Sequence, residues 1–78
     1  EFALLLSATP RDLAVQAAEA VRLLIESQIT TFMEARIAAT LSLGVAELQL
    51  SEAPAALYQR ADERLYAAKR GGRNRVVV

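Results

Sequence analysis

Three stretches of the chain have the apolar pattern of β-strands. From Glu1 to Ser7 nearly every side chain is apolar on both faces, which predicts a strand inside a sheet. From Arg36 to Glu47 larger apolar side chains alternate with small ones, and the face of small side chains permits close packing of a helix. Residues 75–78 include a β-branched run that predicts a short final strand.

Two amphipathic helices are predicted between these strands. The first starts with Thr9 as N-cap and Pro10 at the first helical position, and runs to about Gln28. The second starts near Pro54 and ends at the glycine pair 71–72. The apolar stripe of the first helix contains Leu13, Ala17, Ala20, Val21, Leu24 and Ile25, and that of the second contains Leu57, Ala61, Leu65 and Ala68.

The predicted order is therefore strand, helix, strand, helix, strand, with residues 29–35 as a connector that has no clear pattern. This β-α-β-α-β order predicts an α/β or α+β fold with helices packed on a sheet. A length of 78 residues allows one small domain, and 54% hydrophobic residues are enough to form a core. The first segment lacks the neighbouring strand that it needs, so we expect residues 1–78 to be part of a larger domain.

The composition removes several kinds of chemistry. The chain has neither cysteine nor histidine, so it has no thiolate or imidazole nucleophile, base or metal ligand. Catalysis would have to use carboxylates, lysine or arginine. No apolar run is long enough to cross a membrane or to act as a signal peptide, and we expect a cytoplasmic protein.

The charges are unevenly distributed although they sum to zero. Residues 60–75 hold six basic side chains against two acidic ones, which favours binding of an anion near this end of the chain. A solvated helix face that complements the helix dipole is the alternative interpretation. Nucleic acid is disfavoured as a partner because Tyr58 and Tyr66 lie upstream on the helix, and no aromatic residue is interleaved with the basic residues 69–75 to stack on bases.

Three segments together resemble one family. Glu1-Phe2-Ala3-Leu4-Leu5-Leu6 is similar to the end of a Gly-Gly-(Asp/Glu)-Glu-Phe signature and the strand after it, and Leu41-Ser42-Leu43-Gly44-Val45-Ala46 to a Ser-x-Gly strand. Arg60-Ala61-Asp62, followed by the segment Leu65 to Asn74, resembles an Ala-Asp-x-x-Leu-Tyr-x-Ala-Lys-x-x-Gly-Arg-Asn helix and its exit. These segments, in this order, resemble the GGDEF domains of bacterial diguanylate cyclases.

The resemblance implies an activity and its partners. GGDEF domains condense two GTP molecules into cyclic di-GMP and release pyrophosphate, with one GTP bound by each of two domains that meet as a homodimer. Their fold is similar to the palm of nucleotide cyclases and polymerases, and their cofactor is Mg²⁺ or Mn²⁺. We therefore expect residues 1–78 to be the C-terminal part of one GGDEF domain, preceded in the parent protein by the other half and by a sensory or regulatory domain. The resemblance also allows for a membrane anchor in the other domains of the parent.

The resemblance also suggests roles for individual residues. Lys69, the only lysine of the chain, matches the lysine that contacts the GTP phosphates, and Arg73 matches its arginine partner. Because the C-terminus of a helix is negative, these side chains must supply the attraction for phosphate. Glu1 matches the fourth signature position, beside the acid that ligates metal, and it is a candidate catalytic residue or an ordinary exposed carboxylate. No metal ligand is expected within this sequence, because the metal-binding acids lie upstream.

Three other residues of the matching segment are interpreted as structural. Asp62 and Tyr66 are spaced either for pairing on the helix surface or for bonding to the neighbouring loop, and Asn74 is interpreted as a cap at the helix exit. Two alternatives to a cyclase remain open. One is a degenerate GGDEF module that binds GTP or mediates dimerisation and regulation without catalysis, and the other is a small interaction domain that binds another anion. Residues 1–78 alone are expected to be inactive.

Overall fold

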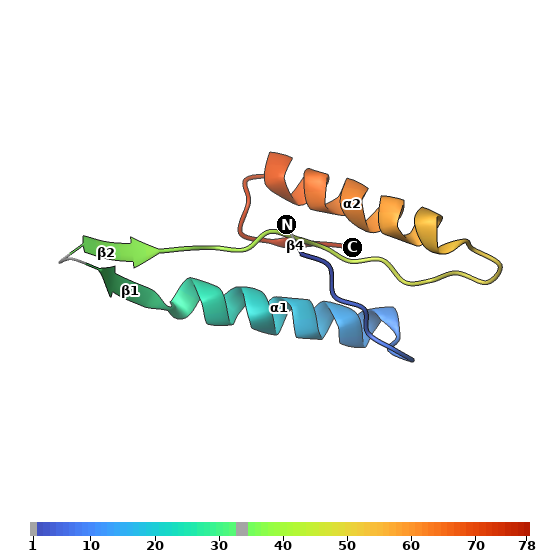
Figure 1. The fold of residues 1–78 in the computed structure, drawn as a ribbon, viewed down its shortest axis with the longest axis horizontal. Helices are drawn as coiled ribbons and strands as arrows, with labels where there is room; N and C mark the ends of the chain where they lie inside the picture. Colours follow the sequence, from blue (N-terminus) through green and yellow to red (C-terminus); the bar gives the residue numbers. More distant parts are fainter. Residues whose placement is uncertain (1, 33–34) are drawn as a thin grey trace.

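The computed structural model describes the backbone of residues 2–32 and 35–78, and the side chains of residues 2–28 and 38–78. Two helices of equal length dominate it, and four short strands accompany them (Figure 1). The bounds are α1 Arg11–Ser27, β1 Ile29–Phe32, β2 Ala35–Ala38, β3 Leu43–Gly44, α2 Pro54–Arg70 and β4 Val76–Val77. The predicted second helix is confirmed: proline lies in its first turn, and Gly71 is its C-cap.

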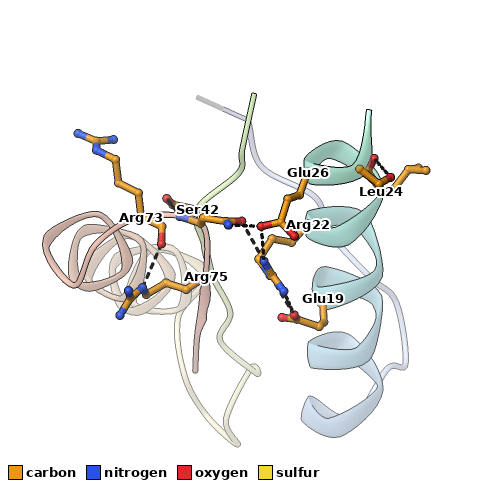
Figure 2. A network of polar contacts seen from close by, with 9 residues as sticks. Glu19, Arg22, Leu24, Glu26, Ser42, Arg73 and Arg75 are labelled. Carbon is orange, nitrogen blue, oxygen red and sulfur yellow. Dashed lines mark hydrogen bonds and ion pairs between the residues drawn. The ribbon is translucent and has the colours of Figure 1, made fainter. Parts of the chain in front are cut away.

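The strands form two separate pairs. β1 and β2 make an antiparallel hairpin, whereas β3 and β4 pair in parallel, with the Leu43 N–H donating to the Arg75 carbonyl and the Val45 N–H to the Val77 carbonyl, both at 2.9 Å. The predicted final strand is therefore confirmed. The β3–β4 pair lies between α1 and α2, and the hairpin extends beyond one end of α1 (Figures 1 and 2). The molecule is accordingly elongated, 52 by 24 by 18 Å.

The closest packing joins β3 to α2. A Cβ atom built on Gly44 would lie 2.2 Å from both the Ala61 carbonyl oxygen and the Leu65 backbone nitrogen. Only a residue without a side chain permits this approach, as predicted for the face of small residues. Ala68, on the same helix, is completely buried, and the predicted apolar stripe of α2 is otherwise half-buried. The core of the described chain is thus the contact of α2 with the parallel strand pair.

Two predicted strands are wrong in extent. Residues 2–7 are not a strand, and Phe2, Leu4 and Leu5 are largely exposed. The predicted strand over residues 36–47 is divided into β2 and β3, with residues 39–42 between them outside any strand. A strand needs hydrogen bonds to a neighbour, and within the described ranges no strand lies beside either segment to provide them.

The first helix also differs from its prediction. Its N-cap is Pro10 rather than Thr9, whose hydroxyl donates to the Ser7 carbonyl at 3.0 Å instead of capping the helix. The predicted apolar stripe is turned away from the strands, since Leu13 is 53% exposed and Leu24 57% exposed. The half-buried residues of α1 are Ala14, Val15, Ala18, Glu19, Arg22 and Ile25, and among them only Ile25 belongs to the predicted stripe. The polar contacts of Arg22, described below, accompany this rotation.

An ion pair fastens the loop before α2. Arg60 donates from Nε to Glu52 Oε2 at 2.7 Å and from Nη2 to Oε1 at 2.6 Å, with side-chain exposures of only 23% for Arg60 and 11% for Glu52. The paired guanidinium, and then the Gln49 N–H that donates to the carboxylate, lower the pKa of Glu52 to about 2. Two parallel charge-assisted bonds of this kind are among the strongest in proteins.

This lowered pKa predicts a pH dependence of stability. The folded protein holds the ionised Glu52 carboxylate more strongly than the unfolded chain does, so the contribution to stability is complete above pH 4.5 and is lost as pH falls through about 2. We expect Glu52→Gln to lower the melting temperature near neutral pH, and the difference from wild type to shrink below pH 4.5 and vanish near pH 2. Thermal unfolding of both proteins over this range is the measurement. A difference that stays constant down to pH 2 would show that the ion pair contributes nothing.

Candidate functional site

The C-terminal end of α2 is basic. The loop that follows it, residues 71–75, leads to β4 and is called the exit loop below. Lys69 and Arg70 occupy the last helical turn. The chain then reverses, since Gly72 has a φ of 121°, which favours glycine, and the Arg73 N–H donates to the Ala68 carbonyl at 2.9 Å. Lys69 and Arg73 therefore lie at the same end of α2, four residues apart along the chain.

The cations around this exit differ in their contacts. The Arg70 guanidinium lies 5.6 Å from the centre of the Tyr66 ring and donates to the Tyr66 hydroxyl at 3.3 Å. Arg75 donates from Nε to the Arg73 carbonyl at 3.0 Å. The exposed side chains of Lys69 and Arg73 make no hydrogen bond or ion pair with any other described residue. These two side chains are therefore available to an anionic ligand.

A hollow of about 230 Å³ borders Lys69. It is lined by Asp62, Leu65, Tyr66 and Lys69, all from one side of α2. Asp62 precedes Lys69 by seven residues, which is about 10 Å along a helix axis. Because the Asp62 carboxylate repels anions, a polyphosphate fits better toward Arg73 than along this hollow. The predicted pairing of Asp62 with Tyr66 is not among the hydrogen bonds of the described residues, in which the Tyr66 hydroxyl accepts a bond from Arg70.

A larger hollow, of about 410 Å³, lies at the other end of α2, away from Lys69. Two arginines that line it already have partners. Arg60 is paired with Glu52, and Arg64 donates to the Val45 carbonyl at 3.1 Å. The hollow is lined by Arg11, Glu47, Leu48, Gln49, Leu50, Arg60 and Arg64. Its polar contacts hold the loop before α2, so we place the candidate site at the C-terminal end of the helix.

Asn74 does not cap α2 as predicted. Its side chain contacts α1, where Oδ1 accepts from Arg22 Nη1 at 2.9 Å and Nδ2 donates to Glu26. Figure 2 labels these two partners on α1. Arg22 also pairs with Glu19 and Glu26, three residues before and four after it. This contact of α1 with the exit loop was not predicted. The only signal for it in the sequence is an arginine with acidic residues at helical spacing on both sides.

Two predictions about metal chemistry involve residues that the structure does not describe or contain. Glu1 lies outside the described residues, so its proposed role stays a prediction. Among the residues that are described, no group of three carboxylates lies close enough together to hold a metal ion. The expectation that the metal ligands lie upstream stays a prediction.

Comparison with known proteins identifies the family. Residues 1–75 match the family described as "Diguanylate cyclase, GGDEF domain", and the chain belongs to this family. The crystal structure of the GGDEF domain of DgcB from Caulobacter crescentus in complex with c-di-GMP matches 88% of this chain with a TM-score of 0.85 and 33% sequence identity. The fold is thus GGDEF-like and of the α/β class. The chain covers 42% of that solved chain.

Several curated relatives are named diguanylate cyclases. The whole chain aligns with DgcM of Escherichia coli at 40% identity, with DgcP of Pseudomonas aeruginosa at 37%, and with diguanylate cyclase A of Treponema denticola at 33%. It spans 18%, 12% and 21% of their respective lengths. In the part of the chain that the structure describes, no helix is both long and apolar enough to cross a bilayer.

Proposed function

We propose that a complete GGDEF domain containing this chain condenses two GTP molecules into cyclic di-GMP and releases pyrophosphate. Family membership, and relatives named diguanylate cyclases, support the reaction class. A related domain was crystallised in complex with c-di-GMP, which supports this product. The observation that carries the proposal for this chain is the pair of cations without described partners, Lys69 and Arg73, at one end of α2.

The proposed task of these two side chains is to bind the phosphates of GTP. Lysine supplies a compact charge with three donors, and arginine a planar fork that binds two phosphate oxygens at once. Negative charge accumulates on the departing pyrophosphate during the reaction, and nearby cations stabilise it. The negative end of the α2 dipole opposes this binding, so the attraction must come from the side chains. Because neither side chain is paired with another of the described residues, no such pair must break before they contact phosphate.

The remaining parts of the proposed machinery lie outside the described residues. A divalent cation, Mg²⁺ or Mn²⁺, would supply further positive charge at the phosphates when bound. Its ligands are proposed to come from the upstream part of the domain, with Glu1 beside them, as the family resemblance implies. Each domain binds one GTP, so joining two nucleotides needs a second copy of the domain as partner. The upstream part is also proposed to complete the palm-like sheet.

The test is incubation of a complete domain that carries residues 1–78 with GTP and Mg²⁺, followed by chromatography for cyclic di-GMP and pyrophosphate. We expect both products in the ratio of one to two. A folded, dimeric protein that binds GTP without product would be a regulatory GGDEF module instead. Equal affinity for GTP, ATP and inorganic tripolyphosphate, again without product, would indicate a general anion-binding domain.

A further inference from the structure

The loop that carries Arg73 is bonded to two other segments through the next residue, Asn74. The Asn74 side chain bonds Arg22 and Glu26 of α1, and its backbone N–H donates to Ser42 Oγ at 3.2 Å, just before β3 (Figure 2). Arg22 and Glu26 are 52 and 48 residues away in the sequence. One asparagine therefore joins α1, the segment before β3 and the exit of α2.

The backbone at this point has an unusual conformation. Arg73 has a φ of 63° and Asn74 a φ of 48°, so two consecutive residues that are not glycine lie in the left-handed region. Asparagine adopts this region more readily than most residues, but arginine does not. Such a conformation persists when surrounding contacts impose it. Here those contacts are the Arg73 N–H bond to Ala68 and the bonds of Asn74.

The charged partners of Asn74 also form ion pairs with one another. The side chain of Arg22 is only 14% exposed and pairs with two glutamates, while it donates to Asn74. The Arg73 guanidinium, by contrast, points away from this cluster (Figure 2). With one arginine paired to two glutamates, the cluster leaves no unpaired cation to attract a phosphate. We therefore assign its effect on ligand binding to the position that it gives Arg73.

We propose that Asn74 is a positioning residue, which, through Arg22, Glu26 and Ser42, holds the exit loop so that Arg73 faces the phosphates of GTP. This inference rests on the proposed function, because it assumes that Arg73 binds phosphate. The inference goes further, because it assigns the orientation of the Arg73 side chain to contacts with α1, which lies on the other side of the β3–β4 pair from α2. Loss of the Asn74 side chain should weaken nucleotide binding even though that side chain does not contact the nucleotide.

The test is a double-mutant cycle in a complete domain that carries this chain, with affinity for a non-hydrolysable GTP analogue measured by calorimetry in the presence of Mg²⁺. The variants are Asn74→Gly, Arg73→Ala and the two combined. Glycine accepts the left-handed backbone and removes only the side-chain bonds. The matched control is Ser51→Gly, which replaces an exposed left-handed residue in the loop before α2, remote from the site.

We expect Asn74→Gly to weaken binding about tenfold, as befits the loss of bonds to charged partners, and Ser51→Gly to leave it unchanged. In the Arg73→Ala background, Asn74→Gly should have almost no further effect, because the group that it positions is already gone. If Asn74 acted on stability alone, Asn74→Gly would lower the affinity by the same factor with Arg73 present and with Arg73→Ala. If Asn74→Gly does not fold, Ser42→Ala removes a single bond to Asn74 and should give about a threefold loss with the same dependence on Arg73.

The outcomes separate this inference from the proposed function. If Arg73→Ala itself leaves affinity unchanged, the assignment of Arg73 to phosphate is wrong, and the positioning role is overturned with it. If Arg73→Ala weakens binding but Asn74→Gly does not, or weakens it equally in both backgrounds, only the positioning role is overturned.

Discussion

Replacing Gly44 by alanine is expected to lower the free energy of unfolding of a GGDEF domain that carries this chain by about 3 kcal/mol. The added Cβ would meet two backbone atoms of α2, the Ala61 oxygen and the Leu65 nitrogen, each at 2.2 Å. Backbone atoms inside a helix cannot move aside as the end of a side chain can. β3 and α2 must therefore separate, which weakens the core around Ala68.

The matched control is Gly71→Ala at the end of the same helix. The φ of Gly71 is −78°, which any residue adopts, and its added Cβ would lie 3.0 Å from the flexible end of Arg75 and 3.1 Å from the Ala67 carbonyl. We expect a loss below about 1 kcal/mol here. Denaturant unfolding of both variants is the measurement. If Gly44→Ala proves no more destabilising than Gly71→Ala, the close approach of β3 to α2 is not part of the folded domain.

The second large effect is expected on catalysis. In a complete domain, Lys69→Ala and Arg73→Ala should each lower kcat/KM for GTP by roughly 10- to 100-fold, the value of a hydrogen bond between a charged donor and phosphate. Both side chains are exposed, so neither substitution should affect folding much. Arg73→Lys should recover part of the loss, because it restores the charge but not the planar fork.

Arg70→Ala is the control for this experiment. Arg70 is adjacent to Lys69 and has the same charge, but it packs on the Tyr66 ring and is not assigned to the phosphates. Steady-state kinetics at one ionic strength should therefore separate Arg70→Ala, with little change, from Lys69→Ala and Arg73→Ala. Equal losses for all three variants would mean that only the overall charge of this end matters.

The helices were more predictable than the strands because their signals are local. Pro54 and the glycine pair 71–72 bound α2 at the positions that the sequence indicates. The segment from Phe2 to Leu6 has a strand pattern but no described neighbour to pair with, so its pattern could not be realised. Pairing between strands depends on segments far apart in the sequence, which a local pattern does not encode.

The rotation of α1 has the same kind of cause. Its apolar residues form a broad stripe, and the sequence does not show which edge of the stripe meets the strands. The bond between Arg22 and Asn74 joins residues 52 positions apart, and no periodicity contains it. For the site, the resemblance to a family suggests Lys69 and Arg73, and the structure adds which neighbouring cations already have partners within the described chain.

The central claim is that Lys69 and Arg73 bind the phosphates of GTP. A crystal structure of a complete, dimeric domain carrying this chain, with a non-hydrolysable GTP analogue and Mg²⁺, tests it most directly. We predict the Lys69 ammonium and the Arg73 guanidinium within about 3 Å of phosphate oxygens. A bound nucleotide with its phosphates held elsewhere and both side chains in solvent would contradict the claim.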